Sequence, residues 1–248
     1  MTRGIDLNAD LGEGGKFDRE LLTLVSSASI SCGAHAGSGQ DIWQAIAWAV
    51  ENNVAIGAHP SYPDRENRGR LSIAIEPAEL YKTLMQQLNW LATLVAEQGG
   101  RLQHVKPHGA LYNDAARDNQ LAVLIAQCVR DFDPSLTLVG LAGGKLLEAG
   151  QSAGLEVRAE AFIDRRYQAD GSLVPRKHER ALITDVAEAL AQARCFITGD
   201  PVTTVDGNSI NVKADTLCIH GDSEYALEFA QHLCSGLLLK GIVVRALS

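Results

Sequence analysis

Short apolar runs alternate with longer stretches of helical period along the whole chain, and no other sequence feature constrains the fold as strongly. The apolar runs have the length of strands, and the stretches between them are long enough for crossover helices. This pattern is typical of βα units around a parallel sheet. A length of 248 residues suits one core, so we expect residues 1–248 to form a single α/β domain. The seven expected strands are Gly4–Leu11, Ser29–Cys32, Val54–Ala58, Leu102–Val105, Leu136–Leu141, Glu156–Ala161 and Thr216–Ile219.

The clearest helix lies in the first half of the chain, where apolar residues from Leu80 to Val95 follow spacings of 4, 4, 3 and 4. It is expected to begin at Pro77 and to end before Gly99, because Pro and Gly are typical of these two positions. A later segment is rich in Thr, Val, Gly and Asn and lacks helical period, so we expect a hairpin there. The other expected helices are Ile42–Glu51, Leu121–Arg130 and Ala226–Leu237, and the expected hairpin is Phe196–Val212.

Composition excludes several classes of protein. With 22 basic and 30 acidic residues the formal charge is −8, and no run of Lys and Arg exists to bind nucleic acid or an anionic membrane. The apolar run Leu237–Val244 is interrupted by Lys240 and is too short to span a bilayer. The N-terminus has no signal-peptide pattern, and the five cysteines are odd in number with no CxxC pair. We therefore expect a cytoplasmic protein with free thiols.

Polar side chains that bind ligands or move protons follow almost every expected strand. In a closed parallel barrel the carboxyl ends of all strands meet on one face, where such folds place their catalysis. The sequence therefore predicts a seven-stranded parallel βα barrel, related to TIM barrels, with a site at that face. The polar residues at or after the strand ends are Asn8, Asp10, Glu13, His35, His59, Asp64, Lys106, His108, Glu160, Asp164, Arg165, Tyr167, His220 and Asp222.

Each of these residues also has a purely structural interpretation. Lys106 precedes a proline and could be solvated, although a neighbouring His108 favours contact with an anion or a carbonyl. For Asp222, and for the nearby polar residues Asp41 and Asn113, the structural alternative is a helix cap without any role in the site. Four histidines lie close to strand ends, which favours a functional role for that set, whereas the other three default to structure. The first set is His35, His59, His108 and His220, and the second is His104, His178 and His232.

Several catalytic motifs are absent. The stretch Gly140–Leu146 is one residue short of a phosphate loop and has Leu where the magnesium-binding Ser or Thr belongs. No GxGxxG follows a strand, and no GxSxG elbow exists. Cys32 lies beside the candidate site, but a buried structural thiol is the favoured interpretation. The available groups are carboxylates and imidazoles without a nucleophilic Ser, which suits hydrolysis by an activated water molecule.

Six motifs together resemble the LamB/YcsF family over nearly the whole chain. The resemblance implies a barrel related to polysaccharide deacetylases. It also implies component A of an ATP-dependent 5-oxoprolinase, which hydrolyses 5-oxoproline (pyroglutamate) to L-glutamate together with subunits B and C. ATP with Mg²⁺ would act at the level of that complex, and no tightly bound metal is expected in this chain. The motifs are DLNADLGE at 6–13, SCGAHAG at 31–37, GAHPSYPD at 57–64, HVKPHGALYN at 104–113, EAFIDRRYQADGSLVPR at 160–176 and CIHGD at 218–222.

The chain departs from the family pattern at two places. The second motif has Ala34 where the family usually has Phe, and Ser38 where it usually has Asp. After the third motif, residues 66–70 keep only Gly69 and Arg70 of the usual Gly-Phe-Gly-Arg. Neither departure removes a proton-transfer group, but the pocket is expected to differ in shape near residue 34.

We assign hypothetical roles within this site. Asp10 or Glu13 with His35 or His59 would act as general acid and base, and Lys106 and His108 would stabilise developing negative charge. The residues expected to bind substrate include two arginines that would hold its carboxylate, on a loop crossing the barrel mouth. The arginines are Arg165 and Arg176, and the rest of the substrate-binding set is Asn8, Asp64, Glu160, Asp164, Tyr167, His220 and Asp222.

Two other functions remain open. The first is a metal-dependent deacetylase or hydrolase of a carbohydrate or amide, with ligands from Asp10, His35, His59 and His108. The second is a non-catalytic binding subunit, which would need an aromatic platform at the barrel mouth. The candidates for that platform are Tyr62, Tyr112 and Tyr167.

Overall fold

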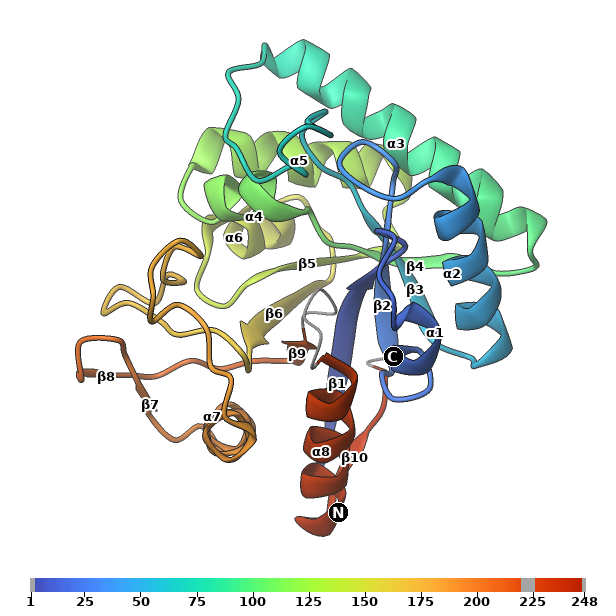
Figure 1. Cartoon of the computed structure of the whole chain (residues 1–248). Helices are drawn as coiled ribbons and strands as arrows, with labels where there is room; N and C mark the ends of the chain where they lie inside the picture. The colour runs from blue at the N-terminus through green and yellow to red at the C-terminus, as the bar shows by residue number, and fades with distance from the viewer. Residues whose placement is uncertain (1–2, 220–225, 247–248) are drawn as a thin grey trace.

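The computed structural model describes residues 3–219 and 226–246, and its centre is a closed barrel of parallel strands (Figure 1). Each strand pairs with its neighbour in chain order, and β9 returns to pair with β1, with Asp6 opposite Thr216. This confirms the predicted seven-stranded parallel βα barrel. The strands are β1 (Arg3–Leu11), β2 (Ser27–Ser31), β3 (Ala55–His59), β4 (Leu102–Val105), β5 (Thr137–Leu141), β6 (Val157–Phe162) and β9 (Thr216–Ile219).

Helices surround the barrel, and the four predicted ones are confirmed. In α3 the buried residues Leu80, Leu84, Leu88, Leu91 and Val95 form the stripe that the spacing predicts. The short helices and α7 have no clear signal of helical period in the sequence. The helices are α1 (Asp18–Leu21), α2 (Gly39–Glu51), α3 (Pro77–Glu97), α4 (Gly109–Ala115), α5 (Asn119–Phe132), α6 (Lys145–Ser152), α7 (Val186–Thr198) and α8 (Ala226–Leu239). None of the helices in the described residues is long and apolar enough to cross a membrane.

The departure at Ser38 has a local structural role. Ser38 caps α2, because its hydroxyl accepts a hydrogen bond from the backbone of Asp41 while the Asp41 side chain accepts one from the backbone of Ser38. Asp41 is therefore part of a capping box, as its structural interpretation proposed. Asn113 is not a cap: it lies inside α4, where its amide donates to Gly109 O over 2.9 Å.

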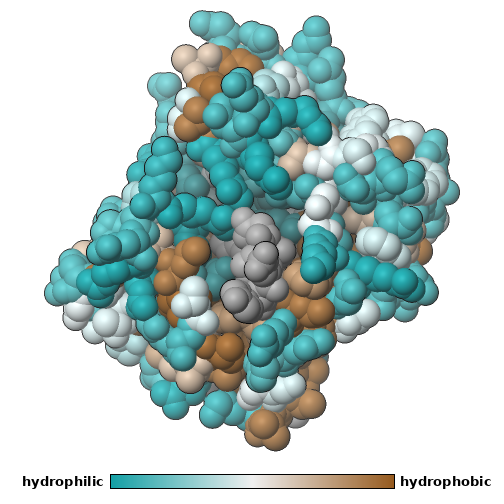
Figure 2. All heavy atoms as spheres, in the orientation of Figure 1, coloured by the Kyte–Doolittle hydropathy of each residue, from teal (hydrophilic) through white to brown (hydrophobic). Residues whose placement is uncertain are grey.

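Two small elements lie beside the barrel. The expected hairpin is present as the antiparallel pair β7 (Val202–Thr203) and β8 (Ser209–Ile210), although the first residues of the predicted segment belong to α7. A short strand that the sequence did not reveal, β10 (Ile242–Val244), pairs with the start of β1. Hydrophobic residues show at the lower end of Figure 2, where α8 ends at the exposed Leu238 and Leu239.

The interior of the barrel is polar. In β1 the buried Leu7, Ala9 and Leu11 belong to the hydrophobic core, while the alternate residues Asp6, Asn8 and Asp10 take part in polar contacts with other strands. Below the strand ends a cavity of about 40 Å³ is lined by polar side chains, among them Asp6, Asn8, His104 and Lys106. The strands therefore carry a polar column up the inside of the barrel to its carboxyl end.

Candidate active site

All six predicted catalytic residues form one connected cluster at the carboxyl ends of β1 to β4. Asp10 ends the polar column of β1, and Glu13 stands in the turn that follows, between Gly12 and Gly14 with positive φ. His35 follows β2, His59 is the last residue of β3, and Lys106 and His108 follow β4. We call these six residues the catalytic cluster. They come from four different βα units, so only closure of the barrel brings them together.

Lys106 is the central cation of the catalytic cluster. Its side chain is buried, with Nζ 2.6 Å from Asp10 Oδ1, 2.8 Å from Glu160 Oε1 and 2.9 Å from Asn8 Oδ1. Burial by itself would lower the pKa of Lys106, but the charges of Asp10 and Glu160 raise it well above its usual value. Lys106 is therefore a fixed positive charge, and the interpretation of a solvated lysine is wrong.

Asp10 connects this cation to the histidines. Its Oδ2 lies 3.4 Å from His59 Nε2, and its other oxygen faces Lys106. Burial opposes ionisation of Asp10, but the charges of His59 and Lys106 outweigh it and hold the pKa well below the usual range. Asp10 is therefore a carboxylate under all physiological conditions.

In both His59 and His108, one ring nitrogen donates a hydrogen bond to a backbone carbonyl. His59 Nδ1 lies 2.7 Å from Lys106 O, and His108 Nε2 lies 2.9 Å from Arg68 O. A carbonyl oxygen can only accept, so these nitrogens carry the hydrogens. The other two, His59 Nε2 and His108 Nδ1, face each other at 3.0 Å. Burial, with the neighbouring His59 and His35, lowers the pKa of His108 to about 3.

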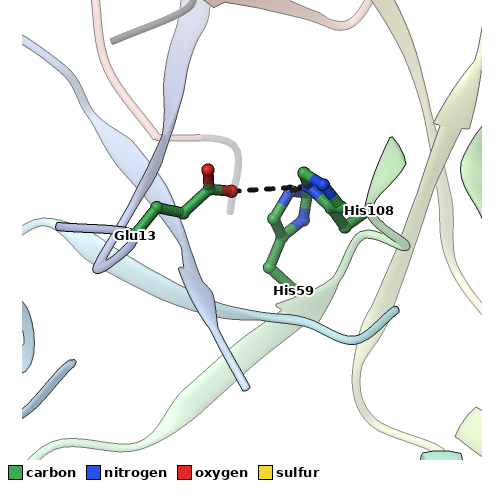
Figure 3. Close-up of side chains that lie close together, drawn as sticks. All are labelled: Glu13, His59 and His108. Carbon is green, nitrogen blue, oxygen red and sulfur yellow. Dashed lines mark hydrogen bonds and ion pairs between the residues drawn. The ribbon is translucent and has the colours of Figure 1, made fainter. Parts of the chain in front are cut away.

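Glu13 and His35 complete the catalytic cluster, and Figure 3 shows Glu13 beside His59 and His108. Glu13 Oε1 is 3.0 Å from His35 Nε2 and 3.4 Å from His108 Nδ1. Burial would raise the pKa of Glu13, but the hydrogen bond from His35 and the charges of the histidines lower it to about 2. His35 Nδ1 is held by Ser61 Oγ at 3.1 Å, and its ring stacks on His108 with 3.7 Å between centroids. Burial lowers the pKa of His35 despite its contact with Glu13.

The segment that departs from the family pattern covers this cluster. Arg68, with φ of 54°, supplies the carbonyl that holds His108, and its Nη2 lies 3.6 Å from Glu13 Oε2. Gly69, also with positive φ, has no room for a side chain, because a Cβ there would lie 2.9 Å from atoms of His35 and His108. Sequence reasoning missed the role of Arg68, since it is made by a backbone carbonyl.

Glu160 and Asn8, predicted to bind substrate, both contact the ammonium group of Lys106. Glu160 is fully buried, and its Oε1 accepts from Asn8 Nδ2 as well as from Lys106. Asn8 also donates to Thr216 Oγ1, which the sequence analysis missed although alternation in the strand sequences could have found it. Neither Glu160 Oε2 nor the buried Tyr112 hydroxyl makes a well-formed hydrogen bond among the described residues.

Three of the remaining predicted substrate-binding residues, Asp64, Arg165 and Tyr167, are not bonded to the catalytic cluster in the described part of the chain. Asp64 shapes its own turn by accepting from Asn67. Arg165 is buried and donates to Val174 O over 2.6 Å, and the Tyr167 hydroxyl accepts from Phe162 N. The contacts of Asp164 and Arg176 are only partly described, and His220 and Asp222 lie outside the described residues.

An aromatic platform is not formed by the three expected tyrosines, because Tyr62, Tyr112 and Tyr167 are all at most 5% exposed. Burial raises the pKa of the Cys32 thiol to about 12, as expected of a structural thiol. His104, assigned to structure, is buried in the barrel interior beside Ser29, and burial lowers its pKa to about 3. His232 is exposed on α8 and bonds only its own helix among the described residues.

Comparison with known proteins places these residues in context. The model of the LamB/YcsF family matches residues 5–248. The chain is similar to the lactam utilization protein from Thermus thermophilus, with 42% identity and a TM-score of 0.91, over 98% of this chain and 100% of that chain. It is also similar to a proposed cellobiose-phosphate cleavage protein from Enterococcus faecalis, with 12% identity and a TM-score of 0.58, over 98% and 97% of the two chains. The second similarity concerns the fold alone.

Proposed function

The chain belongs to the LamB/YcsF family, and on that premise we propose that it is component A of an ATP-dependent 5-oxoprolinase. The reaction is hydrolysis of the cyclic amide of 5-oxoproline to L-glutamate. The observation that carries the proposal is the catalytic cluster, in which carboxylates and imidazoles contact one another and Asp10 pairs with the buried, fixed cation Lys106. The similar protein from Thermus thermophilus is described as a lactam utilization protein, which agrees with a lactam substrate.

The catalytic cluster suits the two proton transfers that opening a lactam requires. A C–O bond forms from water to the carbonyl carbon, the C–N bond breaks, and the leaving nitrogen gains a proton. Glu13 with His35 offers one hydrogen-bonded carboxylate–imidazole pair, and Asp10 Oδ2, 3.4 Å from His59 Nε2, offers a second carboxylate–imidazole contact. Lys106, between Asp10 and Glu160, would stabilise negative charge that develops on the substrate oxygen.

ATP would be handled mainly by the partner subunits B and C. The lactam is an unstrained amide, so transfer of the γ-phosphoryl group of ATP to its oxygen, with release of ADP, would give a better electrophile. Addition of water to the carbonyl carbon, opening of the C–N bond and release of inorganic phosphate would then consume two water molecules in all and give glutamate. In this chain the Gly-rich stretch at 140–146 lacks the spacing of a phosphate loop, and Gly144 serves as the N-cap of α6. Mg²⁺ would accompany ATP in the complex.

Reconstitution tests this proposal. We expect the isolated chain to show little 5-oxoprolinase activity and to gain it when mixed with subunits B and C, ATP and Mg²⁺. The assay measures glutamate and ADP, with mixtures lacking each component as controls. Robust ATP-coupled turnover by the isolated chain, or no turnover by the complete mixture, would contradict the proposal.

A metal-dependent deacetylase or hydrolase is the second candidate function. It is favoured by the convergence of Glu13, His59 and His108, whose ligand atoms all lie within 4.8 Å of one another. The two functions differ in their need for ATP. Hydrolysis of an acetylated sugar or an open-chain amide by the isolated chain, without ATP, would support the second function.

A further inference from the structure

Three carboxylates in and beside the catalytic cluster are contacted by two cationic side chains. Asp10 and Glu160 both contact the ammonium group of Lys106, and Glu13 Oε2 lies 3.6 Å from the half-exposed guanidinium of Arg68. The cluster is buried, where uncompensated charge is costly. A bound cation would balance the remaining negative charge of these carboxylates.

Three candidate ligand atoms also lie close together, all within 4.8 Å of one another. His59 Nε2 and His108 Nδ1 are 3.0 Å apart, and Glu13 Oε1 is 3.4 Å from His108 Nδ1 (Figure 3). Ligands of a tetrahedral ion with bonds of about 2.0–2.1 Å lie roughly 3.3 Å apart, close to these two separations, and the third pair, Glu13 and His59, would have to move together by less than about 1.5 Å. In its neutral form each imidazole presents the nitrogen that bears no hydrogen, because the opposite nitrogen donates to a backbone carbonyl.

The surroundings match those of metal-binding histidines in other proteins. Such histidines almost always donate their second N–H to a carbonyl or carboxylate, which fixes the ring and its tautomer. Here Lys106 O holds His59, Arg68 O holds His108, and His35 Nε2 holds Glu13 Oε1. His35 itself has both nitrogens occupied, by Glu13 and Ser61, so it belongs to the supporting residues and not to the ligands.

We propose that Glu13, His59 and His108 bind one divalent transition-metal ion of the zinc class, with a fourth position left open. This set differs from the alternative ligand set of the sequence analysis, because it includes Glu13 and excludes Asp10 and His35. Asp10 lies 3.4 Å from His59 Nε2 but faces Lys106 with its other oxygen. Bound there, the ion would act as a Lewis acid and lower the pKa of a nearby water molecule.

A binding experiment without substrate tests the site. Chelator-treated protein is titrated with Zn²⁺ in a calorimeter, and we expect one ion per chain. Glu13→Gln, His59→Ala and His108→Ala should each weaken binding by at least about 100-fold, and His35→Ala by about 10- to 100-fold. His232→Ala, at an exposed histidine on α8, is the control and should bind as the wild type does.

Circular dichroism and thermal melting show whether each variant is folded. Where a variant does not fold, the titration of the wild type still shows whether the chain binds one Zn²⁺ ion. Absence of stoichiometric Zn²⁺ binding to the wild type would overturn the site. Equal binding by wild type and a folded Glu13→Gln would overturn the ligand set. The assay contains no 5-oxoproline and no partner subunit, so its failure would leave the proposed function untouched, and failure of reconstitution would leave the metal site untouched.

Discussion

The two halves of the barrel mouth are built in different ways. On the side of β1 to β4, side chains from distant parts of the chain contact one another, as His59 and His108 do across 49 residues of sequence. On the side of β5, β6 and the hairpin, many of the described polar contacts are local. Arg165 donates to Val174 O, and Arg166 pairs with Glu188 at the start of α7. A cleft of about 450 Å³ lies on this second side, lined in part by residues 141–144 and 169–173.

The difference separates two tasks. The first half holds buried groups with strongly shifted pKa values, such as Glu13 and Lys106, which is typical of groups that perform chemistry. The second half has an open cleft and loops tied to their own backbone, which suits binding of a substrate or a partner subunit. Changes in the first half should therefore affect folding and rate, and changes in the second should affect KM.

The largest effect is expected when the central cation is removed. Lys106→Met leaves the buried Glu160 and the partly buried Asp10 without a counter-charge, which should lower the free energy of unfolding by about 3–5 kcal/mol. Urea unfolding followed by circular dichroism measures this. Lys145→Met breaks only the exposed pair with Glu148 and should cost about 0–1 kcal/mol. Equal losses in both variants would contradict the difference between buried and exposed ion pairs.

The second-largest effect is expected on the turnover rate, when one imidazole is removed. His35→Ala and His59→Ala should each lower turnover of the reconstituted complex by at least ~100-fold, the usual contribution of a general acid or base. Initial rates of glutamate formation give the effect, and His232→Ala is the matched control. Near wild-type rates with unchanged thermal melting in both variants would remove these histidines from the mechanism.

The second half is tested by two conservative substitutions. Arg165→Lys and Arg176→Lys keep the charge but lose the planar pair of donors, so at least one should raise KM for 5-oxoproline by about tenfold. Steady-state kinetics of the reconstituted complex separate KM from kcat. If KM and kcat stay unchanged in both variants, the loop that carries Arg165 and Arg176 takes no part in holding the substrate carboxylate.

The smallest effect concerns the turn that carries Glu13. Asp18 accepts a hydrogen bond from Gly12 N, and burial raises its pKa to about 6. A carboxyl whose pKa is higher in the folded than in the unfolded state stabilises the fold at low pH, and this stability is lost as pH rises through 6. As the pH rises from 5 to 8, the free energy of unfolding of the wild type should fall by about 1 kcal/mol relative to that of Asp18→Asn. Parallel pH profiles of stability for the two proteins would show that Asp18 does not titrate in this way.

Local sequence determined the elements and the positions of the polar residues. The stripe from Leu80 to Val95 predicts α3 because one face of a helix must be buried, and alternating apolar runs predict the barrel strands. The placement of Asp10, His35, His59 and Lys106 at strand ends predicts that they share one face. β10 escaped notice because it has three residues and follows α8 within one apolar run.

Tertiary structure alone decided which of these residues meet and what each one does. No local pattern shows that His59 Nε2 and His108 Nδ1 face each other, because the carbonyls that hold the two rings belong to Lys106 and Arg68. The neighbouring groups that shift the pKa of Glu13 and of Lys106 against the effect of burial come together only when the barrel closes. The sequence supplies the charges, but their separations, and hence their energies, exist only once β9 has paired with β1.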